Sequence, residues 1–274
     1  MARQRLGQHF LSDEQWREDI ARAISVSPHS PLIQEAPKGE DTCWIEIGAG
    51  HGEMTEHLLA SGAPVYAIEL DEPLANRLRK LAKKFPNLTV VQDDVLQTDL
   101  AALASGRRIR VYGNLPYYIT SPILHQLFSF ANCIEDIHIV IQDEVAQRLA
   151  AEPGSKLFGY ISVLTQLYAR PEYVLKIPRS AFQPPPEVAS ALVTLRLPGE
   201  RARLGLADEH AFLEFVKRCF SQKRKTLVNN LKAMAKPEHV REALGVEKLR
   251  PDARAEQLSV SQLAALYAAL RSGC

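Results

Sequence analysis

Residues 42–53, TCWIEIGAGHGE, decide the fold that this sequence predicts. The apolar run Thr42–Ile47 is followed by Gly48-Ala49-Gly50-His51-Gly52 and then by an amphipathic pattern through Leu58 and Leu59. A buried strand that turns through glycines into a helix is typical of the first unit of an open α/β sheet. Glycines in such a turn let the backbone approach a ligand closely. The segment therefore predicts a ligand-binding strand–loop–helix unit.

Short apolar runs and helical patterns alternate after this unit. Further strands are expected over residues 65–69, 88–92, 109–113 and 134–142. This alternation indicates βαβ units and a parallel sheet. Residues 173–177 and 189–197 are joined by a proline-rich loop without room for a crossover helix, so we expect an antiparallel edge hairpin. The predicted class is α/β, with a seven-stranded, mostly parallel sheet of the methyltransferase type.

The pattern changes after residue 197. Pro198-Gly199-Glu200-Arg201 marks a shift in composition, and only helices are expected beyond it, over residues 210–220, 223–235, 237–244 and 261–271. We therefore expect two domains, residues 1–199 and a small all-α domain of residues 200–274. Near the N-terminus, Ser12 is the expected N-cap of a helix that carries Trp16 and Ile20 on its apolar face.

The composition excludes several classes of protein. The 274 residues are 46% hydrophobic and 24% charged, and 33 Lys and Arg against 32 Asp and Glu give a net charge of +1. Any nucleic-acid surface must therefore come from local clustering of basic residues. Four scattered cysteines without a CxxC pair argue against a zinc site or a disulfide framework, and no metal is expected. No signal segment or membrane-spanning run is evident, so we expect a cytoplasmic protein without a membrane partner.

The glycine loop predicts the chemistry of a cofactor. Its spacing is GxGxG, and Glu53 stands where a dinucleotide-binding GxGxxG motif has its third glycine. A loop flanked by Glu46 and Glu53 is a poor host for a pyrophosphate. It suits a positively charged cofactor without phosphate, such as S-adenosylmethionine, which Gly48 and Gly50 would approach through their backbone.

Carboxylates follow the next two expected strands. Glu69 ends the second strand, at the position from which a carboxylate can hold both ribose hydroxyls. Asp94 follows the third strand and can accept a hydrogen bond from an adenine amino group. Each carboxylate alone is more simply a solvated strand-end residue, so the cofactor prediction rests on the three strand ends together.

The fourth strand ends in Asn114-Leu115-Pro116-Tyr117-Tyr118, and the proline requires a fixed turn there. The Asn114 side-chain carbonyl and the Leu115 backbone carbonyl can each accept one hydrogen of an exocyclic adenine amine and direct its lone pair at a methyl donor. Tyr117 is expected to stack on the base and Phe182 to close its other face. The plain alternatives are a loop after a core strand and an aromatic side chain that fills the edge of the core.

These motifs together resemble the ribosomal RNA adenine N6,N6-dimethyltransferases. The matching segments are Gly7-Gln8-His9-Phe10-Leu11, EIGAGHGEMT (46–55), AIELD (67–71), GNLPY (113–117) and FQPPPEVASALV (182–193). The resemblance implies a Rossmann-like class I methyltransferase with S-adenosylmethionine as methyl donor. It also implies that the donor, or its junction with the target, is contacted by His9, Leu11, Gly48, Glu69, Asp94 and Asn114. His9 stands where many members carry Asn, so the role of its side chain is open.

The C-terminal part resembles the small-subunit, KsgA-type branch of that family, through RKTL (224–227) with Asn230-Leu231 and through RAEQLSV (254–260). This implies dimethylation of two adjacent adenines in a hairpin near the 3′ end of small-subunit (16S) rRNA, within a pre-ribosomal 30S particle. Nothing in the sequence indicates an obligate interface, so a monomer is expected. The alternatives are a large-subunit methylase of the erythromycin-resistance type and a non-catalytic assembly factor. A nicotinamide-dependent oxidoreductase is disfavoured by Glu53.

Local clusters of basic residues are the candidate RNA contacts. They are Arg3, Arg5, Lys217, Arg218, Lys223, Arg224 and Lys225. The last five are expected where two helices meet near Ser221, which would gather their charge on one face for contact with an RNA backbone. A solvated helix face is the alternative.

Overall fold

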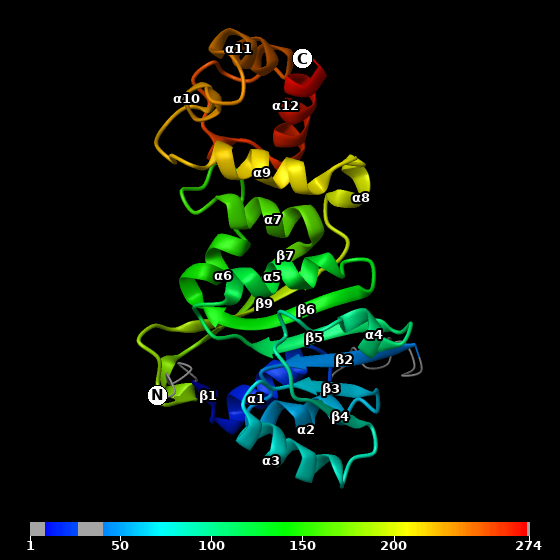
Figure 1. Ribbon diagram of the computed structural model, residues 1–274. Coiled ribbons are helices and arrows are strands. Elements are labelled where there is room, and N and C mark those ends of the chain that lie inside the picture. Colours follow the sequence, from blue (N-terminus) through cyan, green and yellow to red (C-terminus); the bar gives the residue numbers. More distant parts are fainter. Residues whose placement is uncertain (1–8, 27–40, 273–274) are drawn as a thin grey trace, which may run out of the picture. The chain divides into compact units, whose positions relative to one another are not determined.

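The computed structural model describes residues 9–26 and 41–272 (Figure 1). The chain divides into two compact units, unit 1 (residues 1–146 and 172–197) and unit 2 (residues 147–171 and 198–274). The expected boundary near residue 200 lies close to one point where the chain passes between units. Residues 147–171, however, group with the C-terminal helices, because they contain a helix that packs against two of those helices. Arg3 and Arg5 lie outside the described residues.

Unit 1 contains the predicted seven-stranded sheet, in the order β4-β3-β2-β5-β6-β9-β7 (Figure 1). The strands are β2 (Thr42–Ile47), β3 (Val65–Ile68), β4 (Leu88–Val91), β5 (Arg108–Asn114), β6 (Ile134–Gln142), β7 (Arg170–Ile177) and β9 (Ser190–Arg196). The pairs β2–β3, β3–β4, β2–β5 and β5–β6 are parallel, whereas β9 runs antiparallel to β6. The predicted fold class, with its antiparallel pair at the edge, is confirmed.

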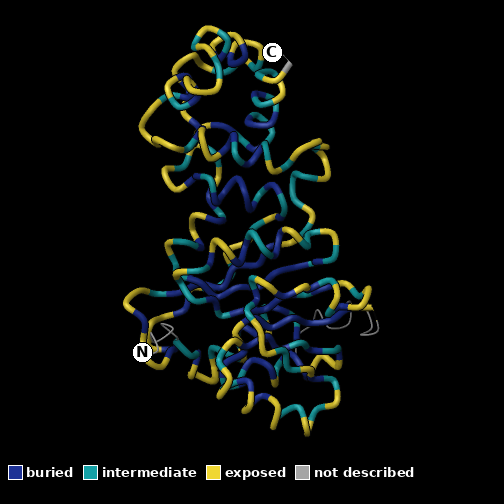
Figure 2. The backbone as a smooth tube through the Cα atoms, viewed as in Figure 1, coloured by how far each residue is buried: buried dark blue, intermediate teal, exposed yellow. Residues whose placement is uncertain are grey.

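The order of the strands places a ligand site. β3 and β4 extend the sheet on one side of β2, and β5 and β6 extend it on the other. In open α/β sheets, ligands bind outside the carboxyl ends of the strands, at the point where the order of the strands reverses its direction. Every residue of β2 is buried, and Figure 2 shows the central strands mostly in dark blue. A run of six buried residues suits a parallel strand that is covered on both faces.

One helix precedes the seven strands and others connect them. They are α1 (Glu14–Ala23), α2 (Glu53–Leu59), α3 (Glu72–Ala82), α4 (Leu100–Ala104), α5 (Thr120–Ser129) and α6 (Asp143–Leu149), the last of which continues into unit 2. Asp71 and Asp99 cap α3 and α4 through hydrogen bonds from Leu74 N and Ala102 N. The expected Ser12 cap of α1 is wrong. Asp13 accepts from Trp16 N instead, while the Ser12 hydroxyl donates to the carbonyl of Ala181.

A two-stranded antiparallel sheet, which we did not expect, holds the N-terminal segment. It pairs β1 (Phe10–Leu11) with β8 (Phe182–Gln183). β8 directly follows a short 3-10 turn, η2 (Arg179–Ala181). The backbone N–H groups of Ser12 and Asp13 also donate to the carbonyl oxygen of Ala181, at 3.0 and 3.2 Å. Two-residue strands carry no periodic signal in a sequence. The pairing brings the segment that begins at His9 beside the proline-rich loop.

A buried charge cluster joins α1 to the sheet. Arg110 on β5 donates from Nε and Nη2 to the Asp136 carboxylate on β6, at 3.0 and 2.9 Å. Its Nη2 also donates to the Ile24 carbonyl at the end of α1, and its guanidinium lies 4.4 Å from the centre of the Trp44 ring. His138 Nε2 lies 3.0 Å from Asp136 Oδ1. The cluster therefore fixes the position of the helix that follows the N-terminal segment.

Unit 2 is helical, and its helices are α7 (Tyr160–Tyr168), α8 (Arg201–Leu204), α9 (Glu209–Cys219), α10 (Leu227–Leu231), α11 (Pro237–Val246), η3 (Ala255–Gln257) and α12 (Val260–Ser272). The helix expected over residues 223–235 is much shorter and begins only at Leu227. Asn230 Nδ2 donates to the carbonyls of Cys219 and Gln222, at 2.6 and 3.2 Å, and thereby holds the preceding residues in a turn. Across the described ranges, no helix has the length and hydropathy needed to cross a bilayer.

Candidate active site

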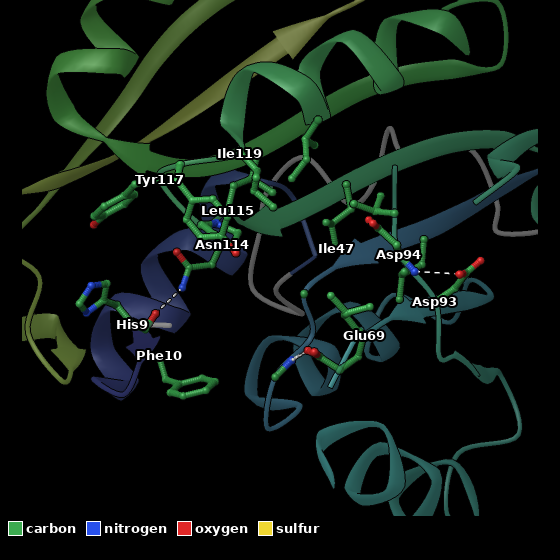
Figure 3. A pocket seen from close by; sticks show the side chains of 18 residues that line it. His9, Phe10, Ile47, Glu69, Asp93, Asp94, Asn114, Leu115, Tyr117 and Ile119 are labelled. Carbon is green, nitrogen blue, oxygen red and sulfur yellow. Dashed lines mark hydrogen bonds between the residues drawn. The ribbon is translucent and has the colours of Figure 1, made fainter. Parts of the chain in front are cut away.

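A pocket of about 870 Å³, including the solvent at its mouth, lies at the carboxyl ends of β2, β3, β4 and β5. Among the residues predicted for cofactor and base, those that line the pocket are His9, Gly48, Gly50, Glu69, Asp94, Asn114, Leu115 and Tyr117. Figure 3 shows the carboxylates Glu69 and Asp94 on one side and His9 and Tyr117 on the other, with Asn114 near the rings. The pocket therefore has an acidic end and an aromatic end.

Glu69 is a buried acidic group of the pocket, and both of its carboxylate oxygens accept backbone hydrogen bonds. Only 3% of this residue is exposed. Its Oε2 accepts from Gly50 N and its Oε1 accepts from Asp71 N, both at 2.9 Å. Because a carboxylate offers about four lone-pair sites, both oxygens keep capacity for hydroxyl donors. Glu69 is therefore oriented before any ligand binds.

Two further carboxylates follow β4. Asp93 Oδ1 accepts from Asp94 N at 2.8 Å, and Asp94 Oδ1 accepts from Leu96 N at 2.9 Å, so successive backbone donors fix both side chains. Of the described residues that line the pocket, none is Lys or Arg. An acidic lining without a cation fits S-adenosylmethionine, which carries a positive charge and no phosphate. The same lining is a poor fit for a dinucleotide.

The glycine loop has the backbone shape that its sequence suggested. Gly48 and Gly50 have φ values of +67° and +58°, in the left-handed region that favours glycine. A Cβ on Gly48 would meet no atom within 4 Å, whereas one on Gly50 would lie 3.0 Å from Cε1 of Phe10. The Phe10 ring itself lines the pocket and packs against His51, with ring centres 4.4 Å apart. No role could be predicted for Phe10 from the sequence, because its contact with the loop depends on the unexpected β1–β8 pairing.

Asn114 ends β5 with a fixed side-chain orientation. Its Nδ2 donates to the His9 carbonyl oxygen at 2.8 Å, so Oδ1 is the atom left to accept from a ligand (Figure 3). The turn that follows is tightly packed, since a Cβ on Gly113 would lie 2.8 Å from Leu115 Cδ2 and 3.2 Å from Ile47 Cβ. The structure thus brings an oriented amide oxygen to the pocket, at the strand end where the sequence predicted one.

Tyr117 forms the aromatic end of the pocket together with His9. The Tyr117 hydroxyl is hydrogen-bonded to Ser190 Oγ at 2.8 Å, which anchors the far edge of the ring. Its ring centre lies 5.8 Å from that of His9, with 27° between the ring planes. His9 Nδ1 donates to the Pro184 carbonyl at 2.8 Å. Both rings are therefore held by hydrogen bonds at their edges.

Two predicted site residues lie elsewhere. Phe182, expected to close the second face of the base, is 2% exposed and belongs to the hydrophobic core, as does Leu11. They are cross-strand partners in the β1–β8 pair, and neither lines the pocket. The contact of Phe182 with the base stays a prediction. In this structure Phe182 lies where the alternative placed it, as an aromatic side chain that fills the edge of the core.

Glu46 differs from its expected electrostatic role. It is 2% exposed at the end of β2, and Thr55 Oγ1 donates to its Oε2 at 2.5 Å. Burial raises the pKa of Glu46 to about 8; the Thr55 hydrogen bond opposes the rise, and the charges of Glu53 and Glu69 add to it. At neutral pH the carboxyl is mainly protonated, so the negative charge of the pocket comes from Glu69, Asp93 and Asp94.

The basic cluster of unit 2 is only partly available to a ligand. Lys217 on α9 donates to Glu214 Oε1 at 2.6 Å, and the Lys223 ammonium donates to the Lys156 carbonyl. Arg218, Arg224 and Lys225 are exposed, and no ion pair within the described part of the chain involves them. The last two lie in the turn between α9 and α10, so they project from a loop and not from the expected helix.

Comparison with known proteins places the chain in a family. The sequence pattern of the family described as ribosomal RNA adenine dimethylase matches residues 1–271. A protein from Xanthomonas campestris pv. campestris (strain B100) named ribosomal RNA small subunit methyltransferase A is 40% identical over 260 residues, which cover 95% of this chain and 93% of the relative. The protein of that name from Xanthomonas axonopodis pv. citri (strain 306) is 39% identical over the same coverage.

Solved structures agree in fold. The 23S rRNA methyltransferase ErmE is 26% identical and superposes with a TM-score of 0.69 over 96% of this chain and 99% of its own. A dimethyladenosine transferase from Plasmodium falciparum, at 23% identity, superposes with a TM-score of 0.75 over 96% of this chain and 98% of its own. The match of the family pattern along nearly the whole sequence and the 40% identity to a relative lead to one conclusion. The chain belongs to the ribosomal RNA adenine dimethylase family.

Proposed function

We propose that this protein transfers methyl groups from S-adenosylmethionine to N6 of two adjacent adenines, in a hairpin near the 3′ end of small-subunit (16S) rRNA. The orientation of Asn114 is the observation that carries the chemistry, because an amide oxygen left free at the pocket suits an amine donor. The choice of rRNA is supported by relatives at 39–40% identity that are named small subunit methyltransferases, against 26% for the 23S rRNA enzyme ErmE.

The acidic end of the pocket would hold the methyl donor. When bound, S-adenosylmethionine supplies a methyl group attached to a positively charged sulfonium. Glu69 would accept hydrogen bonds from the ribose hydroxyls, and Asp94 would accept one from the adenine amino group. A Cβ on Gly48 would meet no atom within 4 Å, so this glycine leaves the backbone of the loop open on the pocket side, whereas the space beside Gly50 is filled by the Phe10 ring. The buried, pre-oriented Glu69 carboxylate limits the reorganisation that binding requires.

The aromatic end would hold the target adenine. Asn114 Oδ1 and the Leu115 carbonyl oxygen would each accept a hydrogen from the exocyclic amine. An amine held in this way turns its lone pair toward the methyl donor, which is catalysis by positioning and electrostatics. Tyr117 would stack on the face of the base and compensate for part of its unstacking from neighbouring nucleotides.

The exposed cations of unit 2 support an RNA substrate. Arg218, Arg224 and Lys225 would contact phosphates, which positions RNA without reading its sequence. We propose a pre-ribosomal 30S particle as the natural substrate and a cytoplasmic monomer as the active form. Free thiols at Cys43, Cys133 and Cys219 are consistent with a reducing compartment.

The test is a methylation assay with labelled S-adenosylmethionine and separate substrates. These are small-subunit precursor particles, naked small-subunit rRNA and large-subunit particles, each followed by mapping of the modified nucleotides. The proposal expects label as N6,N6-dimethyladenosine at two adjacent positions of small-subunit rRNA. Label in large-subunit RNA would assign the chain to the resistance-type methylases, and the absence of label from every substrate would support a non-catalytic assembly role.

A further inference from the structure

One exposed arginine of unit 1 is tied to the proline-rich loop that borders the pocket. Arg179 lies in η2, and its Nε donates to the carbonyl oxygen of Pro186 at 2.6 Å, across that loop. The same loop presents the carbonyl oxygen of Pro184 to His9 Nδ1 at 2.8 Å, and His9 lines the pocket. Figure 1 shows this yellow-green segment beside β1, with which it pairs through β8. The loop and its two hydrogen bonds therefore connect Arg179 to the rim of the pocket.

We propose that Arg179 binds a phosphate of the RNA strand that delivers the target adenine to the pocket. This inference rests on the proposed function, and it adds a substrate contact in unit 1 to the cations of unit 2. The bond from Nε to the loop orients the guanidinium, and the two terminal nitrogens contact the phosphate oxygens.

The guanidinium of Arg179 has donors left for such a ligand. An arginine carries five N–H groups, and the Pro186 carbonyl takes the one on Nε. Arg179 is exposed, and no ion pair within the described part of the chain involves it. The N–H groups on Nη1 and Nη2 form a planar fork whose geometry matches two oxygens of a phosphate.

The charges along this segment single out Arg179. Residues 172–190 contain two basic side chains, Lys176 and Arg179. Lys176 Nζ forms an ion pair with Asp143 Oδ2 at 2.9 Å, so its charge is balanced within the protein. Glu187 is exposed in the proline-rich loop, and among the described residues it forms no ion pair with Arg179. Arg179 is thus the cation of this segment that an RNA phosphate can neutralise.

The charge of the pocket makes such a cation useful. Glu69, Asp93 and Asp94 line the pocket, and none of the lining residues that the structure describes is Lys or Arg. An adenine that leaves its stack to enter the pocket brings the phosphates of its own strand to the rim. The carboxylates repel those phosphates, so a cation on the bordering loop favours the entry of the base. Phosphate contacts also fix the position of a strand without reading its sequence.

Two substitutions separate a phosphate contact from support of the loop. Arg179→Gln places an amide nitrogen as many bonds from Cα as Nε, so it can still donate to Pro186 but carries no charge. Arg179→Lys keeps the charge and loses the Nε donor. We expect the KM for small-subunit precursor particles to rise about 10- to 50-fold in Arg179→Gln and less than about fivefold in Arg179→Lys.

The salt dependence of RNA binding reports the lost charge. The Kd for small-subunit rRNA is measured by filter binding without methyl donor, and it should rise in Arg179→Gln. Loss of one phosphate contact should reduce the slope of log Kd against log salt by about 0.7, the value for one contact to a single strand. Arg179→Lys should keep the wild-type slope. The Kd for S-adenosylhomocysteine, measured by calorimetry, should not change in either variant.

An RNA hairpin with two adjacent adenines in its loop locates the phosphate. Uncharged methylphosphonates replace the phosphates around the adenines one at a time. At the contacted position the replacement should weaken binding to the wild type but have little further effect on Arg179→Gln. Arg77→Gln makes the same chemical change at an exposed residue of α3, and this matched control should behave as the wild type throughout. Thermal unfolding verifies that each variant is folded.

Three results would overturn the assignment. The first is an unchanged KM and salt slope in Arg179→Gln, and the second is a loss in Arg179→Lys as large as that in Arg179→Gln, which would point to support of the loop. The third is a methylphosphonate effect that adds fully to Arg179→Gln at every position. A wild-type protein that methylates no adenine, but whose RNA binding loses affinity and salt slope in Arg179→Gln, would contradict the proposed function and leave the phosphate contact standing. The two failures are therefore distinguishable.

Discussion

Neutralising Glu69 should weaken methyl-donor binding strongly. In Glu69→Gln, the single amide oxygen can accept only one of the two backbone N–H bonds, from Gly50 and Asp71, that the carboxylate accepts at 2.9 Å. The amide nitrogen then faces a backbone donor. Hydrogen bonds to charged groups contribute about 1.5–3 kcal/mol each, and the ribose hydroxyls lose their charged acceptor as well. Loss of one such contribution corresponds to a Kd for the donor that is about 10- to 100-fold higher.

The assay is titration calorimetry with S-adenosylhomocysteine, supported by the shift of the unfolding temperature that the ligand produces. Glu72→Gln is the matched control. This substitution makes the same chemical change at an exposed residue in the first turn of α3. Its Kd should equal that of the wild type. A Glu69→Gln Kd within about twofold of the wild-type value would refute the assignment of Glu69 as the ribose-binding carboxylate.

Three further predictions concern charge. Burial raises the pKa of Glu46 to about 8, so its contribution to stability is present below the unfolded-state pKa of about 4 and is lost as pH rises from there to about 8; Glu46→Gln should therefore show a flatter urea-unfolding free energy between roughly pH 5 and 8. Burial opposes ionisation of Asp136, but His138 and Arg110 outweigh it and hold its pKa well below the usual value. Its contribution is thus present above the unfolded-state pKa of about 4 and lost at lower pH, and Asp136→Asn should destabilise the protein by about 3–5 kcal/mol at neutral pH, with less change in acid. Arg224→Glu with Lys225→Glu should weaken RNA binding and reduce its salt dependence in filter-binding assays; unchanged affinity, or altered donor affinity, would contradict their assignment as phosphate contacts.

The sheet and the strand-end residues could be predicted because their signals are local. Each apolar run is long enough to show a strand, and parallel strands present their carboxyl ends at one edge. Gly48, Glu69, Asp94 and Asn114 therefore meet at one pocket as the strand order requires. A functional residue at the end of a strand can therefore be predicted even where the predicted bounds of that strand are slightly wrong.

The environment of Phe182 could not be predicted in the same way. Whether this ring faces the pocket or the core depends on its pairing with Leu11, from a distant part of the chain, through strands of two residues. The position of the His9 side chain could not be predicted for the same reason, since it follows from that pairing. The sequence shows that aromatic residues are available for the proposed base site, but not which of them is buried.

The ends of helices and the partners of surface charges could not be predicted from the sequence pattern either. The helix expected from residue 223 begins at Leu227, because Asn230 bonds to the carbonyls of Cys219 and Gln222 and stabilises a turn. Such side-chain bonds to the backbone compete with helix formation. Likewise Lys217 has a carboxylate partner one helical turn away, which a count of basic residues does not show.

The most direct test of the account is the turnover of Asn114→Ala measured beside its affinity for the methyl donor. Loss of the oriented amide oxygen should lower kcat by about 10²- to 10³-fold on small-subunit rRNA, the range seen when one preorganised transition-state contact is removed. The Kd for S-adenosylhomocysteine should stay near the wild-type value. Asn87→Ala, which removes a comparable side-chain bond to the Ala63 carbonyl in unit 1, is the control and should leave kcat unchanged. An Asn114→Ala protein that dimethylates adenine at the wild-type rate would contradict the central claim that Asn114 positions the reacting amine.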